Sequence, residues 1–217
     1  CVKLGQFDEY THRSDYSPQR IVEQFNQSIR RLNTDYIDIV LVHAPSLAKV
    51  KDQKAITILQ TLRALGKVKA IGYSFESEPE HVNETITNQD IDVIMLQYNL
   101  LERECEITIK KASEHGVGIL VGGPFKRGYL TGRWRTTEDI AEERDDYWKW
   151  NLRYNKDKVK NILERVNLHL EKASSPKELR KKSLEFVLSQ PVASAIIGHR
   201  TLEEVKENIK SLEKKNG

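Results

Sequence analysis

The sequence has only two cysteines, no long apolar run and no large excess of charge of either sign. Cys1 and Cys105 cannot build a disulfide framework, and no Cys-x-x-Cys pair or Cys/His cluster indicates a metal site. No stretch reaches the roughly 18 apolar residues of a membrane-spanning helix. The first residues, CVKLGQFDEY, also lack the basic start and apolar middle of a signal peptide. We therefore expect a cytoplasmic protein that has no metal site and does not contact membranes.

The charged residues are numerous but nearly balanced. The 35 basic and 32 acidic residues are spread along the chain, so a nucleic-acid partner is not indicated. Hydrophobic residues make up 38% of the 217 residues and charged residues 31%, which is typical of a globular protein able to bury a core. We expect a single domain over residues 1–217.

Short β-branched runs alternate with amphipathic helical stretches, which is typical of parallel βα units. Strands are expected at 2–4, 36–43, 68–74, 93–98, 118–121 and 194–197. Helices are expected from Ser17 to about 32, at 55–65, 79–88, 104–115, 156–172 and 177–189, and from Thr201 onward. Between the fifth strand and the next helices, a long polar stretch at about 123–155 is expected to be a functional or mobile loop.

Helix ends carry recognisable capping residues. Ser17 followed by Pro18 is expected to begin the first helix, and Gly66 is expected to end the second in a left-handed conformation. Thr201 and Glu204 form a capping-box pattern at the start of the last helix. The inner face of that helix is expected to consist of Leu202, Val205, Ile209 and Leu212.

Parallel strands with a helix after each fit either an open doubly wound sheet or a closed (β/α)₈ barrel. The dinucleotide fingerprint Gly-x-Gly-x-x-Gly is absent, yet six strands are two short of a barrel. His43, Ser74 and Gln97 stand at carboxyl ends of strands, where both architectures place their sites. The pattern alone leaves both architectures open.

Two side chains near strand ends have a structural and a functional interpretation. His43 either caps its strand through a backbone carbonyl, or presents an imidazole that orients a substrate oxygen. Lys3 is either a solvated residue near the chain start, or a cation that lowers the pKa of a neighbouring acid.

Two segments are candidate phosphate sites. The stretch 122–132 has four glycines, whose backbone could approach a phosphate, with Lys126 or Arg127 adding charge; a flexible loop is the alternative. The segment 198–201 precedes a capped helix whose N-terminal amides and dipole favour an anion beside Arg200. Thr201 and Glu204, however, already satisfy some of those amides.

Five motifs in order resemble those of the aldo/keto reductase family. Residues 28–39 with 41–45 resemble the family signature around its catalytic histidine, and 66–74 (GKVKAIGYS) resembles its strand GKIRAIGVSN. Later motifs of the family are matched by 98–103, 128–132, and 198–201 with Glu207 and Asn208. The resemblance covers essentially the whole chain and implies a (β/α)₈ TIM barrel, of which this sequence supplies about six units.

The resemblance implies two catalytic residues within this sequence. In the family a tyrosine protonates the carbonyl oxygen, a lysine paired with an aspartate tunes that tyrosine, and a histidine orients the substrate. His43 matches the histidine, and Lys3 matches the lysine at the end of the third barrel strand. The aspartate and tyrosine belong to an earlier segment. Tyr10 and Tyr16 follow Lys3 on a different loop, so we do not take them as replacements.

The resemblance also implies a nicotinamide cofactor, NADP with NAD as the second possibility. Phe75 stands where the family has an asparagine after Ser74, and Met95 stands where it has a glutamine, for which Gln97 is a possible replacement. Gly122 takes the place of the aromatic that stacks on the nicotinamide. The implied cofactor-binding residues are Ser74, Gln97, Gly122, Phe125, Arg127, Gly198, His199, Arg200, Thr201, Glu207 and Asn208.

The implied activity is hydride transfer to or from a carbonyl or alcohol substrate; a cofactor-binding or scaffold protein that has lost catalysis is the alternative. A partial barrel would expose two sheet edges, so we expect about 50–80 further residues upstream, or a partner chain, a second copy included, that covers the gap. Because the family's tyrosine precedes the sequence, we expect negligible reduction of 4-nitrobenzaldehyde by these 217 residues alone.

Overall fold

The computed structural model of the chain describes residues 1–8, 13–142, 152–153 and 155–212, which form two compact units. We call the first, residues 1–97, 104–122 and 190–194, the sheet unit. The second, residues 98–103, 123–189 and 195–217, is called the helical unit. The expectation of a single domain over 1–217 stays a prediction.

A parallel sheet organises the sheet unit. Within the described residues the sheet has six strands in the order β1-β4-β5-β6-β7-β8, and the pairs from β1 to β7 are parallel. The strands of the sheet are β1 Val2–Leu4, β4 Ile37–His43, β5 Val68–Ser74, β6 Val93–Gln97, β7 Gly118–Gly122 and β8 Ser194–Ile196, and of β8 only Ser194 belongs to the sheet unit. The predicted α/β class with a parallel sheet is therefore confirmed. A small antiparallel pair that the sequence analysis missed follows β1, namely β2 Gln6–Asp8 and β3 Arg13–Ser14.

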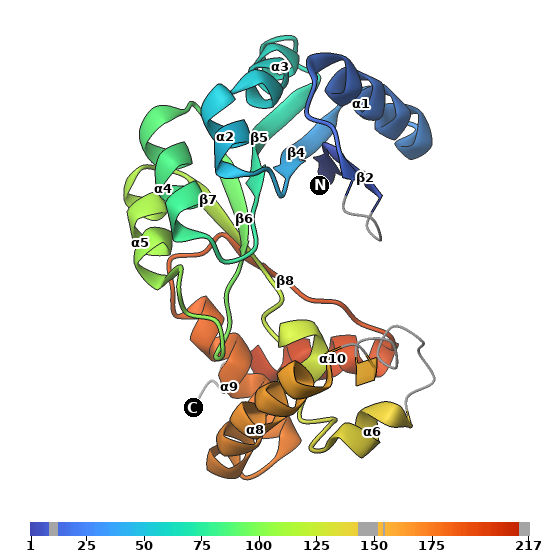
Figure 1. Cartoon of the computed structure of the whole chain (residues 1–217), viewed down its shortest axis with the longest axis vertical. Helices are drawn as coiled ribbons and strands as arrows, with labels where there is room; N and C mark the ends of the chain where they lie inside the picture. The colour runs from blue at the N-terminus through green and yellow to red at the C-terminus, as the bar shows by residue number, and fades with distance from the viewer. Residues whose placement is uncertain (9–12, 143–151, 154, 213–217) are drawn as a thin grey trace. The chain divides into compact units, whose positions relative to one another are not determined.

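Helices connect the strands of the sheet unit and cover one side of the sheet (Figure 1). As predicted, Ser17 caps the first of these helices: its side chain accepts from the Arg20 N–H, and Pro18 lies in the first turn. Gly66 follows the helix that ends at Ala64 and has a φ of +70°, which is the left-handed conformation predicted for it. The short helix α2 was not predicted. The helices are α1 Pro18–Leu32, α2 Leu47–Asp52, α3 Lys54–Ala64, α4 Pro79–Asn88 and α5 Glu106–Glu114.

The two faces of the sheet differ in what they bury. Alternate residues such as Val40, Ile71, Ile94 and Ile119 are fully buried, and they supply the core beneath the helices. The opposite face carries a smaller apolar cluster of Leu41, Val93, Met95 and Leu120. The second cluster lies on the face that the candidate site residues share.

The helical unit consists of short and long helices around a core of its own. Its elements are η1 Lys126–Thr131, α6 Thr137–Ala141, α8 Lys156–Ala173, α9 Pro176–Leu188 and α10 Leu202–Leu212. The expected loop at 123–155 is thus partly helical, because Tyr129, Leu130, Trp134 and Ile140 are buried in this core. The rest of that expectation, residues 143–151 and 154, lies outside the described residues.

The predicted inner face of the last helix is wrong for three of its four residues, whereas Val205 is half-buried. Leu202, Ile209 and Leu212 are 61%, 59% and 39% exposed, whereas Asn208 is only 8% exposed. The Asn208 amide bonds the His199 ring at 3.0 Å, and this polar contact lies on the buried side of α10. Helical periodicity identified the apolar stripe but not the side on which the helix packs.

In the part of the chain that the structure describes, none of the helices is long and apolar enough to cross a membrane. The same residues contain no group of three or more His, Cys, Asp or Glu side chains arranged to hold a metal ion.

Candidate functional site

Five candidate residues of the sheet unit lie on one face of the sheet. In the parallel ladder Lys3 pairs with Leu41, His43 with Ser74, Ser74 with Met95, and Gln97 with Gly122. Because side chains alternate along a strand, these positions share the face of the Leu41–Met95–Leu120 cluster. The fold therefore brings to one face, mostly at strand ends, the predicted residues Lys3, His43, Ser74, Gln97 and Gly122.

Position 5, two residues after Lys3, favours glycine. Lys3 itself is exposed on β1. Gly5 has a φ of +100°, and a side-chain carbon there would lie 2.5 Å from the Tyr16 ring. The Gly5 N–H donates to the Gln24 side chain at 2.7 Å, and the Gly5 carbonyl accepts from the Asp15 N–H at 2.7 Å. These contacts fix where β1 ends.

The strand end at His43 is held by its backbone. The Tyr16 hydroxyl donates to the carbonyl oxygens of His43 and Ala44, at 2.9 and 3.0 Å, and the Ala44 N–H donates to the Ser74 carbonyl at 2.8 Å. Burial raises the pKa of Tyr16. A tyrosine whose proton is engaged in this way is a poor acid but a good anchor for the strand end. The His43 side chain is half-buried, and both interpretations of its ring stay open.

Two neighbours of these residues cannot bind a polar ligand group. Ser74 is buried on the shared face, but Phe75 has the opposite parity along the strand. Its ring stacks on Tyr73 and lies against His81 of α4, with both ring centroids 5.5 Å away. Met95 is 7% exposed within the apolar cluster. Neither side chain therefore supplies the amide that the resemblance calls for.

Gln97 and Gly122 depend on each other. A side-chain carbon on Gly122 would lie 3.1 Å from Nε2 of Gln97, so the Gln97 amide occupies the space beside the glycine. The Gln97 backbone is fixed by its N–H to the Glu76 carbonyl at 2.8 Å. An amide is therefore held over the end of β7, where a larger residue at 122 would displace it.

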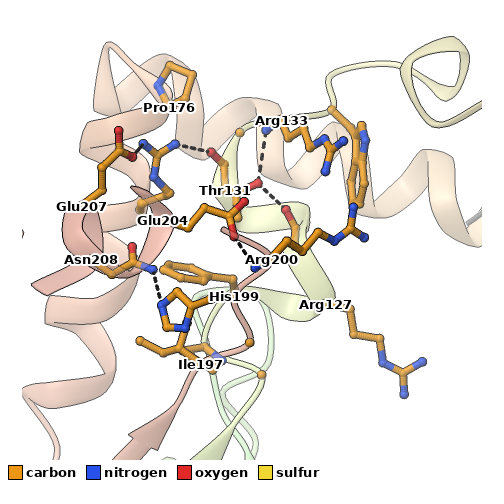
Figure 2. Close-up of a pocket in the computed structure, with 18 of the residues that line it drawn as sticks. Arg127, Thr131, Arg133, Pro176, Ile197, His199, Arg200, Glu204, Glu207 and Asn208 are labelled. Atoms are coloured by element: carbon orange, nitrogen blue, oxygen red, sulfur yellow. Dashed lines mark hydrogen bonds and ion pairs between the residues drawn. The ribbon is translucent and has the colours of Figure 1, made fainter. Parts of the chain in front are cut away.

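The helical unit contains a pocket of about 690 Å³ (Figure 2). Among the predicted residues, those that line it are Phe125, Arg127, Gly198, His199, Arg200, Glu207 and Asn208. Thr201 lies beside it, as the cap of α10. Several lining residues were not predicted from the sequence, among them Arg133, Trp134, Pro176 and Arg180.

The turn from β7 into the pocket is strained and tied down. Lys126, Arg127 and Gly128 have φ values of 48°, 54° and 98°, so two non-glycine residues adopt the left-handed conformation, at a cost of about 1 kcal/mol or more each. The buried Asn99 amide donates to the Gly123 carbonyl at 3.1 Å and to the Glu102 carboxylate at 2.8 Å. Glu102 in turn pairs with the Lys126 ammonium. This network positions the predicted glycine-rich segment as one wall of the pocket.

The opposite wall is the start of α10. The Thr201 hydroxyl accepts from the Glu204 N–H at 3.2 Å, as the capping pattern predicted. The Glu204 carboxylate, however, accepts from the N–H of Arg200 at 2.7 Å. Arg180 of α9 connects both walls, donating to the Thr131 carbonyl at 3.3 Å and to Glu207 at 2.8 Å.

The chemistry of this pocket suits an anionic, partly aromatic ligand. Its described lining includes four arginines, Arg127, Arg133, Arg180 and Arg200, against two glutamates, and apolar surface from Phe125 and Trp134. Guanidinium groups bind phosphate oxygens, and flat apolar side chains accept a ring. Figure 2 shows the Arg127 side chain directed away from the other labelled residues.

A comparison with protein-family models decides the family. The model described as the aldo/keto reductase family matches residues 1–216. The chain belongs to the aldo/keto reductase family.

Individual aldo/keto reductases agree with this assignment. The chain is 33% identical to the aldo-keto reductase YhdN of Bacillus subtilis over 80% of this chain and 52% of that protein. It is 28% identical to the NADH-specific methylglyoxal reductase of Escherichia coli over 97% of this chain and 64% of that protein. The chain thus spans between about half and two thirds of the length of these relatives.

Solved aldo-keto reductases share the fold. The holo form of aldo-keto reductase AKR11C1 from Bacillus halodurans has a TM-score of 0.71 and 28% identity, covering 92% of this chain and 63% of that one. The expected aldo/keto reductase fold, with a partial barrel of parallel strands, is confirmed. The roles expected for individual site residues stay predictions.

Proposed function

We propose that this aldo/keto reductase is an NAD(P)H-dependent oxidoreductase that transfers a hydride between a nicotinamide and a carbonyl or alcohol carbon of a small molecule. The observation that carries the proposal is the helical-unit pocket, in which two motifs far apart in sequence each supply one of four lining arginines. The relative named as an NADH-specific methylglyoxal reductase is in keeping with a small carbonyl substrate. We place the protein in the cytoplasm, in keeping with its two free cysteines.

The residues present fit the adenosine and phosphate end of such a cofactor. The pocket volume lies within the range of small-molecule sites, and its donors are guanidinium, amide and imidazole groups. In this proposal the strained turn with Phe125 and Arg127 holds phosphate oxygens. The base and ribose are held by the segment Gly198, His199, Arg200 and Thr201 together with Glu207 and Asn208.

The sheet unit would position the reacting groups. The nicotinamide supplies the hydride when it is bound. Ser74 and the Gln97 amide, held over Gly122, are the polar groups proposed to orient its carboxamide. His43 would hold the substrate oxygen from the end of β4, and the ammonium of Lys3 would stabilise negative charge that develops there.

One observation favours a second function, cofactor binding without turnover. Phe75 turns its ring into the core beneath α4, and Met95 is packed in the apolar cluster, so two amides that the family uses are absent. Poor placement of the nicotinamide would slow hydride transfer severely.

A binding and rate experiment separates these functions. Calorimetric titration with NADH and NADPH should give saturable binding under both proposals. In a protein that turns over an aldehyde, His43→Ala should lower kcat by a factor of about 10²–10⁴, whereas His115→Ala, at an exposed histidine that ends α5, should not. Binding without carbonyl reduction by a protein that also contains the family's aspartate and tyrosine would favour the second function, and no binding would contradict both.

A further inference from the structure

A carboxylate of the chain already occupies the anion position at the start of α10. Glu204 lies in the first turn of the helix, is half-buried and lines the pocket. Its Oε2 accepts from the Arg200 N–H at 2.7 Å, and Figure 2 shows this carboxylate among the pocket side chains. The Thr201 hydroxyl accepts from the Glu204 N–H. Two backbone amides that would otherwise attract a phosphate, those of Arg200 and Glu204, therefore bond to groups of the protein itself.

The neighbouring polar groups are engaged as well. The His199 ring nitrogen Nε2 is bonded to the buried Asn208 amide, and the Arg180 guanidinium is paired with Glu207 across a distance of 2.8 Å. The described lining at this end of the pocket thus presents two carboxylates, Glu204 and Glu207. Glu207 neutralises the charge of Arg180, with which it is paired.

In the proposed function the adenosine ribose lies at this end of the pocket, and the two nicotinamide dinucleotides differ only at that ribose. NADPH carries a phosphate on the 2′-oxygen, whereas NADH carries a hydroxyl there. A carboxylate accepts a hydrogen bond from a hydroxyl but repels a phosphate. Resting on the proposed function, we infer that the pocket selects NADH over NADPH, and that Glu204 is the residue that determines this choice.

Arginines that bind the pyrophosphate do not set this preference. Both dinucleotides carry the same pyrophosphate, so a guanidinium that binds it strengthens both complexes equally. Discrimination comes from the groups that meet the extra phosphate, and at the start of α10 the backbone donor at Arg200 is occupied by Glu204. The inference differs from the expectation, drawn from the family resemblance, that NADP is the preferred cofactor.

Calorimetry on the full 217-residue chain tests the inference with two matched ligand pairs. The first pair is NADH and NADPH, and the second is adenosine 5′-monophosphate and adenosine 2′,5′-bisphosphate. Each pair differs by one 2′-phosphate. We expect the ligand without this phosphate to bind at least about tenfold more tightly in both pairs, which is about 1.4 kcal/mol.

Two variants then test whether Glu204 is the cause of the NADH preference. Glu204→Gln removes the charge but keeps an oxygen that can accept from the Arg200 N–H. It should lower the NADH/NADPH affinity ratio about tenfold, mainly by strengthening NADPH binding. Glu203→Gln makes the same charge change one residue earlier on α10, at an exposed position outside the described pocket lining, and should change the ratio less than about twofold. Circular dichroism checks that both variants are folded.

The outcomes separate this inference from the proposed function. Tighter or equal binding of NADPH by the unchanged protein would overturn the inference and leave the proposed oxidoreductase standing. NADH preference that survives intact in Glu204→Gln would show that another residue sets it. Failure of all four ligands to bind a folded sample would overturn the pocket assignment, and the inference with it.

Discussion

In the sheet unit the candidate residues stand mostly at the ends of hydrogen-bonded strands, whereas in the helical unit they stand on turns and helix ends tied together by polar side chains. His43, Ser74 and Gln97 take their places from the register of the ladder. The pocket walls take theirs from bonds such as Arg180 to Glu207 and Asn208 to His199. Disturbing strand pairing should therefore damage the first site, and removing single polar groups should damage the second.

The two sites also differ in the substitutions that they tolerate. The ladder that orders the strands consists of backbone bonds that do not depend on side-chain identity, so the sheet unit accommodates Phe75 and Met95 at positions where the family has amides. In the pocket wall, two non-glycine residues in the left-handed conformation are retained only because surrounding contacts hold them. Loss of those contacts releases the strained turn.

The largest effect is expected for Gly72→Ala in β5. A side-chain carbon at Gly72 would lie 1.6 Å from the Val93 carbonyl oxygen, so β5 and β6 would have to separate. We expect a loss of about 3 kcal/mol or more in the free energy of unfolding, or no folding of the sheet. Urea unfolding followed by circular dichroism measures it.

A matched control for Gly72 lies in β7. Gly118→Ala places its new carbon no closer than 3.6 Å to another atom, and its effect should be within about 0.5 kcal/mol of zero. Equal losses of unfolding free energy in the two variants would mean that the close approach of Gly72 to Val93 is not the cause of the destabilisation.

Asn99→Asp is the corresponding test of the helical unit. The change removes both amide donors and sets a buried carboxylate against Glu102 and the Gly123 carbonyl. We expect a loss of about 3 kcal/mol in unfolding free energy, since a buried charge would be left beside like charge, and weaker binding of NADH. Asn88→Asp, at an exposed asparagine that bonds Glu84 in α4, should cost only about 0.3 kcal/mol.

A similar small cost for both asparagine variants, in chemical denaturation, would contradict the role given to the Asn99 network. If Asn99→Asp loses unfolding free energy but still binds NADH normally, the Asn99 network stabilises the unit without shaping the pocket.

The order of strands and helices could be predicted because apolar periodicity is a local property of the sequence. The ends of β4 and β5 at His43 and Ser74 were predicted to the residue, and alternation along the strands placed them on one face. The same parity argument, applied to Phe75, would have shown that its ring turns toward the helices. Periodicity does not say which side of a helix meets its neighbours, and for α10 this led to the wrong face.

The pocket was only partly predictable because its partners are distant in sequence. Arg180 bonds the Thr131 carbonyl 49 residues away and Glu207 27 residues away, and no local pattern marks it. The motifs at 122–132 and 198–201 could be found because turns and helix caps leave short-range signatures. What those signatures could not show is that Glu204 bonds the Arg200 N–H.

The variant Tyr16→Phe tests whether a single side chain helps to stabilise the end of β4 in the sheet unit. The variant loses the hydroxyl that donates to the His43 and Ala44 carbonyls, and should lower the unfolding free energy by about 1–2 kcal/mol. Tyr36→Phe, at an exposed tyrosine just before β4, should cost less than half as much in the same thermal or urea unfolding. No difference between the two would show that the ladder alone fixes the end of β4.

The smallest effect is expected in the interior of the sheet unit, at Cys105. Burial raises the pKa of this thiol to about 11, well above its ordinary value, because the thiolate is poorly solvated there. The folded protein therefore keeps the thiol neutral while the unfolded chain ionises, so stability is fully present below about pH 9 and is lost as the pH rises toward 11. Between pH 8 and 10 the protein should lose about 1 kcal/mol more unfolding free energy than Cys105→Ala does. Urea titrations at each pH measure this slope, and Cys1→Ala, at the exposed cysteine, should leave it unchanged. Parallel curves for the protein and Cys105→Ala would mean that the thiol ionises as readily in the folded chain as in the unfolded one.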